Sequence, residues 1–212
     1  HLVNEVIEEI PTRSNKVIDQ VIYKLPGGNT VIDFDTPQSV TIFGHDGIKR
    51  TDKDFFSAYV LTHILGGSGF GSRLMTELRE KNGLTYGVSA YLASWEKADL
   101  ILGQFASSNN TVMEAIGIVK NEWATLADRG VTADELRDAK TFLTGAYPLR
   151  FDGNSRIARI LTGMQIQGLP IDYIHTRNAK VNAVTMEDIK RVATRILKEK
   201  NLYFVIVGRP TP

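Results

Sequence analysis

The sequence predicts an α+β fold, in which an antiparallel β-sheet carries helices packed on one face. The order of the expected elements is strand, two helices, two strands, several helices and a last strand. The expected strands are β-branched or alternating, whereas the expected helices repeat apolar residues every three or four positions. With 42% hydrophobic and 23% charged residues over a length of 212, the composition is that of an ordinary globular protein.

Bulk properties exclude several classes of function. The net charge of +1 gives no electrostatic reason to expect a nucleic acid or an anionic membrane as partner. Because the chain has no cysteine, it can form neither a disulfide nor a thiolate metal site. No apolar run approaches the roughly 20 residues of a membrane span, and we expect no signal peptide from the sequence as it stands. The chain begins with His1 rather than Met, so we expect a piece of a longer chain, from which a targeting segment could be lost.

Residues 1–36 are predicted to be a lead-in segment or a linker from an upstream domain, and residues 37–212 the α+β domain. Residues 3–10 place four apolar side chains on one helical face. The β-branched stretch Val17–Leu25 and the stretch Thr30–Phe34 flank a Pro-Gly-Gly-Asn turn and predict a hairpin. An arm packed on the same domain is the alternative to a linker.

The domain opens with a strand at Ser39–Gly44 and a helix at Asp52–Leu65, capped by Asp52 or Thr51. A glycine-rich turn, Gly66–Gly71, follows. It lacks the Gly-Lys-Ser/Thr of a P-loop and follows a helix rather than a strand, so it does not match a nucleotide-binding motif. Glycine permissiveness in a flexible connector is the alternative reading of this turn.

A short helix is predicted at Ser72–Lys81, stopped by Asn82-Gly83 because these residues tolerate the left-handed conformation of a helix C-cap. Two antiparallel strands follow at Thr85–Ala93 and Leu100–Phe105, joined through residues 95–98. The last part of the chain predicts helices and one strand with these boundaries: Thr111–Arg129, capped by Asn109 or Asn110 and ended by Gly130; Ala133–Tyr147, with a capping box from Thr132 to Glu135 and an end at Pro148; Asn154–Gln167; Ile171–Asn182; Thr185–Leu197, with a capping box to Asp188; and the strand Leu202–Val207.

The histidines do not predict a zinc site in this chain. A helix that binds catalytic zinc through two histidines can carry the motif His-x-x-Glu-His. None of the four histidines has a second histidine within five residues. His63 is therefore expected to be a core or cleft-facing helix residue, and His175 a surface residue. No Gly-x-Ser-x-Gly nucleophile motif accompanies a matching His and acid.

Arg79 and Tyr86 are the most informative pair, seven positions apart on either side of a tight helix-to-strand turn. Tyr86 is expected to open the strand. Together the two side chains could hold a peptide carbonyl, since Arg donates several N–H groups and Tyr one O–H. The alternative is that Arg79 pairs with Glu77 or Glu80 on the surface and Tyr86 packs as an ordinary strand residue.

The run SRLMTELREKNGLTYGVSA, residues 72–90, resembles the pitrilysin/insulinase family of zinc metallopeptidases. It resembles the non-catalytic, C-terminal-type half of that architecture, which is related to mitochondrial processing peptidase subunits, and the likeness extends from about Gln38 to Val207. In that half an Arg and a Tyr with this spacing line the substrate cleft, so the resemblance implies substrate contact by Arg79 and Tyr86. It also implies that the glycine turn borders the cleft, through Gly67 and Gly69.

The resemblance implies that this chain binds no zinc and is inactive alone. Zinc would be held by an HxxEH-bearing partner domain or subunit, and the substrate would be a peptide or an unfolded polypeptide. A scaffold subunit without catalytic role and a stand-alone peptide-binding domain are alternatives, and a homodimer is left open. For compartment, the family favours the bacterial periplasm or cytoplasm, with the mitochondrial matrix as a further option.

Overall fold

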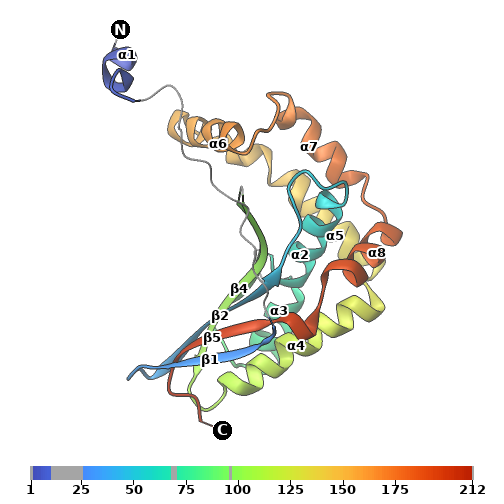
Figure 1. Cartoon of the computed structure of the whole chain (residues 1–212). Helices are drawn as coiled ribbons and strands as arrows, with labels where there is room; N and C mark the ends of the chain where they lie inside the picture. The colour runs from blue at the N-terminus through green and yellow to red at the C-terminus, as the bar shows by residue number, and fades with distance from the viewer. Residues whose placement is uncertain (1, 11–25, 68–70, 96, 212) are drawn as a thin grey trace.

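A twisted five-stranded sheet forms one layer of the fold (Figure 1). The computed structural model of the chain describes residues 2–10, 26–67, 71–95 and 97–211. Within these residues the strand order is β1-β5-β2-β4-β3. The strands are β1 Gly28–Asp33, β2 Gln38–Asp46, β3 Val88–Trp95, β4 Ala98–Ser108 and β5 Tyr203–Gly208.

The pairing of β2, β3, β4 and β5 is antiparallel, as predicted. β3 and β4 form the predicted hairpin, in which Trp95 pairs with Ala98. β1 instead pairs in parallel with β5, at the far end of the chain. The predicted hairpin partner Val17–Leu25 lies outside the described residues. Residues 28–33 of the predicted lead-in segment therefore belong to the sheet, and a domain boundary at residue 36 stays a prediction.

Helices cover one face of the sheet (Figure 1), so the α+β class with one-sided helices is confirmed. α2 lies against β3, α4 lies against β4, and α8 packs on both of these helices. The helices are α1 Leu2–Ile7, α2 Phe55–Gly66, α3 Arg73–Met75, the π-helical segment η1 Thr76–Lys81, α4 Val112–Arg129, α5 Ala133–Gly145, the 3₁₀ segment η2 Pro148–Arg150, α6 Asn154–Ile166, α7 Tyr173–Asn182, α8 Met186–Ile196 and the 3₁₀ segment η3 Glu199–Asn201.

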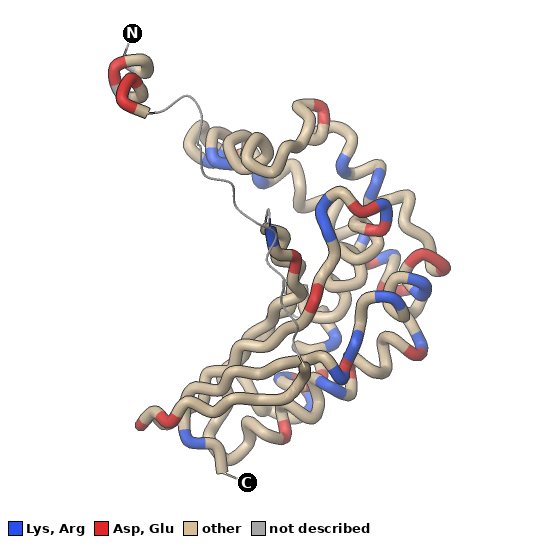
Figure 2. Tube along the Cα trace, viewed as in Figure 1, with Lys and Arg blue, Asp and Glu red and all other residues tan. Residues whose placement is uncertain are grey.

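The alternation of side chains along β2 separates a buried face from an open one. Phe43 points into the core, where its ring stacks on Phe204 at 5.4 Å and meets Trp123 edge-on at 5.7 Å between ring centroids. Val40 and Ile42 point to the other face and are 50% and 51% exposed. This uncovered face lies on the inside of a crescent whose other arm is α6 (Figure 1), and the strands that form it are almost free of charged residues (Figure 2).

Local capping signals set three helix ends where the sequence predicts them. Both predicted capping boxes form: the Thr132 and Thr185 side chains accept from the third backbone N–H of their helices, and Glu135 and Asp188 complete the boxes. Gly130 ends α4 with a φ of +74°, a conformation that suits glycine.

Two predicted N-caps are wrong. α2 begins after Asp54, because the Asp52 carboxylate accepts from the Asp54 backbone N–H at 2.9 Å and stabilises a turn ahead of the helix. α4 begins after Thr111 rather than after Asn109 or Asn110. Asn109 is used elsewhere, since its side chain donates to the Thr36 carbonyl at 2.8 Å and accepts from Ser39 at 2.7 Å.

Candidate functional site

Arg79 lies on a π-helical turn. The predicted helix Ser72–Lys81 forms as α3 followed by η1, and Arg79 is half-buried in η1 while its neighbour Leu78 is fully buried. π-Helical turns are rare and occur frequently at functional sites. The Glu77 carboxylate accepts from Lys81 at 2.6 Å, and pairing of Arg79 with Glu77 or Glu80 stays an alternative prediction.

An ion pair fixes the start of this segment to the neighbouring helix. The Arg73 guanidinium donates to both carboxylate oxygens of Glu135, at 2.6 and 2.8 Å, and to the Gly130 carbonyl at 3.1 Å. Burial raises the pKa of Glu135, but hydrogen bonds from Arg73 and Thr132 outweigh it and bring that pKa below its ordinary value. The carboxylate that closes the α5 capping box therefore also anchors the segment that carries Arg79.

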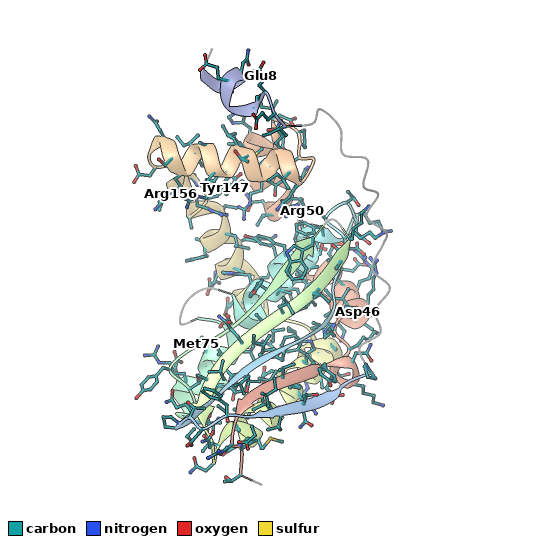
Figure 3. The ribbon with its side chains drawn as sticks, turned by 60° about the vertical axis from the view of Figure 1, so that its left-hand side comes forward. Glu8, Asp46, Arg50, Met75, Tyr147 and Arg156 are labelled. Atoms are coloured by element: carbon teal, nitrogen blue, oxygen red, sulfur yellow. The ribbon has the colours of Figure 1, made fainter. Side chains whose placement is uncertain are left out.

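The turn after η1 is held by backbone and side-chain hydrogen bonds. Gly83 takes a φ of +63°, and the Leu84 N–H donates back to the Leu78 carbonyl at 2.7 Å. The Leu84 carbonyl in turn accepts from the Ser107 hydroxyl on β4 at 2.7 Å. At the start of β3, the Val88 N–H donates to the sulfur of Met75 at 3.4 Å (Figure 3). The helix stop at Asn82-Gly83 is as predicted.

Tyr86 lies in this turn and not in the strand, which begins at Val88, so the prediction that Tyr86 opens the strand is wrong. The reason is local: the Thr85 hydroxyl accepts from the Gly87 N–H at 3.1 Å and donates to the Gly87 carbonyl at 2.8 Å, which replaces ladder pairing by a side-chain turn. Thr85 is buried, whereas Tyr86 is 85% exposed. An aromatic side chain is thus presented to solvent on a turn that is pinned on both sides.

Packing alone explains the glycine at position 67. A Cβ there would lie 2.3 Å from His63 Nδ1 and 2.6 Å from the His63 carbonyl oxygen, so no larger residue fits at the end of α2. Gly69, the second glycine predicted to border a cleft, lies outside the described residues. A substrate role for either glycine stays a prediction.

The histidines are dispersed. His45 lies in the core, where the Trp123 Nε1–H donates to His45 Nε2 at 2.8 Å and His45 Nδ1–H donates to the Asp46 carbonyl at 2.7 Å. Burial lowers the pKa of His45. His63 stacks on Phe142 with 5.1 Å between ring centroids, and His175 is exposed. Among the described residues no three His, Asp or Glu side chains lie close enough together to hold a metal ion, so this donor set does not fit zinc.

Two adjoining hollows have volumes of about 470 and 380 Å³. The first opens between β3 and the helices α2 and α5, and the second is lined by helix and loop residues, among them residues of α2, α6 and α7. Arg50, Arg150 and Arg177 line both of them, and we refer to the joint space as the arginine hollow. Gly67 lines the first hollow, but Arg79 and Tyr86 are not among its described lining residues. No sequence motif points to these three arginines, because they are widely separated along the chain.

Comparison with known proteins identifies the family of the chain. The family model described as the peptidase M16 inactive domain matches residues 1–143. The chain belongs to the peptidase M16 inactive-domain family. The predicted likeness to the non-catalytic half of zinc metallopeptidases is thereby confirmed.

Individual relatives agree with this family. The "non-peptidase homolog YmxG" of Helicobacter pylori is 29% identical over 92% of this chain and 43% of its own length. The alpha subunit of the mitochondrial-processing peptidase of Bos taurus is 26% identical over 75% of this chain and 32% of its own. A crystal structure of a peptidase M16 inactive domain from Pseudomonas fluorescens has a TM-score of 0.82 and 29% identity, over 93% of this chain and 46% of that one.

The chain spans less than half the length of these relatives. In the described part of the chain, no helix combines the length and the apolarity that crossing a membrane requires.

Proposed function

We propose that this chain is the non-catalytic half of a zinc metallopeptidase, and that Arg79 and Tyr86 bind peptide substrate in a cleft completed by an HxxEH-bearing domain or subunit. Membership of the inactive-domain family supports the first part. The observation that carries the second part is Tyr86, an aromatic side chain 85% exposed on a turn fixed by hydrogen bonds to both flanks.

The physical role of the pair follows from the reaction. A peptide carbonyl oxygen gains negative charge during hydrolysis, and donors already held in position stabilise that charge more than they stabilise the ground state. Arg79 lies on a helical segment that is tied to α5 through Arg73 and Glu135, so its position does not depend on a flexible loop. Zinc is assigned to the partner, and Gly67 and Gly69 border the cleft without supplying chemistry.

The test is peptide cleavage by this chain combined with its HxxEH-bearing partner. We expect Arg79→Ala and Tyr86→Phe each to lower kcat by about 10²–10³, the usual cost of losing one transition-state donor. Lys81→Ala is the matched control, because Lys81 is a cation on the same π-helical turn with a side chain that is 61% exposed. This control should cleave like the wild type.

Association with the partner is measured in parallel by analytical ultracentrifugation. A loss of activity with assembly intact supports a direct role of the pair. If both variants assemble and cleave at the wild-type rate, the pair has no role in substrate binding and the proposal is wrong.

A scaffold subunit is the second candidate, favoured by the relative from Helicobacter pylori, which is named a non-peptidase homolog. A scaffold would strengthen assembly or stability of its partner without changing the chemistry. In that case Arg79→Ala and Tyr86→Phe would leave both partner binding and turnover unchanged, while loss of the whole chain would destabilise the partner.

A further inference from the structure

Positive charge converges on the arginine hollow from three distant segments. Arg50 comes from the loop between β2 and α2, Arg150 from η2 and Arg177 from α7. Arg159 on α6 lines the second hollow as well. None of the described lining residues of either hollow is an aspartate or a glutamate. α6 itself contains two arginines and no acidic residue (Figure 2).

Arg177 is buried, with only 4% of its surface exposed. No carboxylate is among its described hydrogen-bond partners. Its guanidinium donates to three neutral acceptors: the Leu143 carbonyl at 2.7 Å, the Asn178 side chain at 2.8 Å and the Tyr59 hydroxyl at 3.1 Å. It also lies 4.4 Å from the centre of the Tyr147 ring. These three hydrogen bonds go to neutral groups, so no described carboxylate offsets the charge, whereas buried charges in proteins are ordinarily paired.

Two other side chains in the hollow experience this charge. Burial, and then the proximity of Tyr173, raises the pKa of the Tyr147 hydroxyl, while the charges of Arg177, Arg150 and Arg50 all act on it in the opposite direction. Tyr147 and the three arginines line the same two hollows, and Arg50 and Tyr147 are marked in Figure 3.

On the other wall of the hollow, burial lowers the pKa of His63, and the Arg177 charge lowers it further. The Arg177 charge therefore acts on His63 in the same direction as burial does.

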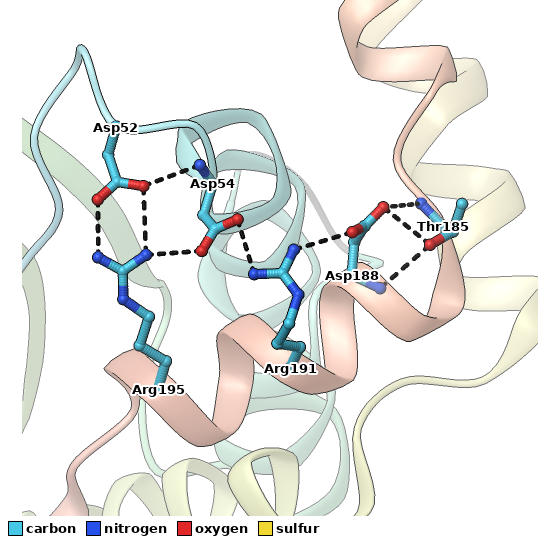
Figure 4. Close-up of polar contacts among 6 residues, drawn as sticks. All are labelled: Asp52, Asp54, Thr185, Asp188, Arg191 and Arg195. Atoms are coloured by element: carbon cyan, nitrogen blue, oxygen red, sulfur yellow. Dashed lines mark hydrogen bonds and ion pairs between the residues drawn. The ribbon is translucent and has the colours of Figure 1, made fainter.

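Arg50 is held in place before any ligand arrives. Its guanidinium lies 4.2 Å from the centre of the Phe55 ring and donates to the Tyr173 hydroxyl at 2.5 Å. The loop that carries it is tied down beyond Arg50: the Asp54 carboxylate accepts from Arg191 at 2.7 Å and from Arg195 at 2.6 Å (Figure 4). A fixed guanidinium loses little conformational entropy on binding an anion.

A strand edge that could pair with an extended peptide borders the first of the two hollows. Ala90, Tyr91 and Leu92 all line it, although consecutive strand residues point to opposite faces of a sheet. The three residues can all line the hollow because it borders the edge of β3, which is the outer strand of the described sheet. Strand edges recognise extended peptides through backbone pairing. Phe142 and Phe55 supply apolar surface beside the charges.

We propose that the arginine hollow binds a carboxylate of a peptide that lies along the edge of β3. This assignment rests on the proposed function and narrows its substrate class to peptides that place an acidic group beside apolar residues. Planar guanidinium groups match a carboxylate in geometry as well as in charge. The carboxylate can come from an acidic side chain or from the peptide C-terminus.

The experiment is isothermal titration calorimetry on the full 212-residue chain without any partner. Three pentapeptides are compared: one amidated with a central glutamate between two phenylalanines, the same peptide with glutamine, and the glutamine peptide with a free C-terminus. Arg150→Gln is the test variant, since Arg150 is an exposed lining residue whose replacement leaves the packed core intact. Arg156→Gln is the matched control, an exposed arginine on α6 that is not among the described lining residues.

We expect at least one carboxylate peptide to bind and the neutral peptide to bind about tenfold to a hundredfold more weakly, the usual value of a charge-assisted contact. Which acidic peptide binds identifies the source of the carboxylate. Arg150→Gln should remove most of the difference between acidic and neutral peptides, and Arg156→Gln should preserve it. Equal binding of all three peptides, no binding of any of them, or equal effects of the two substitutions, would each overturn the proposal.

The outcome is separable from that of the cleavage assay. If cleavage needs neither Arg79 nor Tyr86 while binding still depends on Arg150 and the acidic group, only the proposed function fails. If cleavage depends on the pair while all three peptides bind alike, only the arginine hollow fails as a carboxylate site.

Discussion

The core hydrogen bond between Trp123 and His45 allows a quantitative test of the packing. Trp123 is fully buried on α4, and its indole N–H donates to His45 Nε2 on β2 at 2.8 Å. The substitution Trp123→Phe keeps an aromatic ring but removes this donor. It leaves the His45 acceptor in a core that water does not reach.

Two costs add in this variant. An unsatisfied buried acceptor costs about 1–3 kcal/mol. The lost ring atoms remove roughly two buried carbon groups, at about 0.8 kcal/mol each, before any cavity relaxes. We therefore expect Trp123→Phe to lower the free energy of unfolding by about 3–5 kcal/mol. With an m-value of about 2–3 kcal/mol per molar, the urea midpoint should fall by about 1–2 M.

The assay is urea unfolding at pH 8, followed by far-ultraviolet circular dichroism because the substitution removes a fluorophore. Trp95→Phe is the matched control: Trp95 is 56% exposed at the end of β3, so its replacement should change stability by less than about 0.5 kcal/mol. A second check is the double variant His45→Leu/Trp123→Phe, which removes both partners and should cost less than the sum of the single variants. Equal destabilisation by Trp123→Phe and Trp95→Phe would refute the reasoning.

Two further predictions concern charged groups. Burial lowers the pKa of His45 in the folded chain, so the unfolded chain binds the proton first as pH falls below about 6.5. The free energy of unfolding should therefore decrease from pH 7.5 to pH 5.5, and it should decrease less steeply in His45→Asn. Urea midpoints measured at each pH test this. Asp54→Asn should cost about 1–2 kcal/mol, because it weakens two hydrogen bonds from half-exposed Arg191 and Arg195. Asp134→Asn, at an exposed surface pair, should unfold like the wild type, and equal midpoints for the two Asp variants would contradict this account.

Features that depend on a few neighbouring residues were predictable from the sequence. The capping boxes at Thr132 and Thr185 and the glycine stop at Gly130 form as expected, since each involves groups within about four residues of one another. The β3–β4 hairpin is also local. The placement of Tyr86 was wrong by two residues, because a hydroxyl turn at Thr85 competed with strand pairing.

Long-range pairing was not predictable in the same way. Nothing near Gly28–Asp33 indicates that this strand pairs in parallel with Tyr203–Gly208, since the partner lies at the other end of the chain. The π-helical form of Thr76–Lys81 was also missed. Its sequence is an ordinary helical one, and the tie between Arg73 and Glu135 fixes the start of the segment only in the folded chain.

The sequence by itself determined the class of fold, most helix and strand positions, and the likeness of residues 72–90 to an inactive metallopeptidase half, because these depend on local patterns. Only the tertiary structure decided which side chains share a space. It brings Arg50, Arg150 and Arg177 from three separate segments around one hollow and leaves Tyr86 exposed elsewhere. The physical reason is that burial and charge accumulate through packing between distant elements, which no window of the sequence contains.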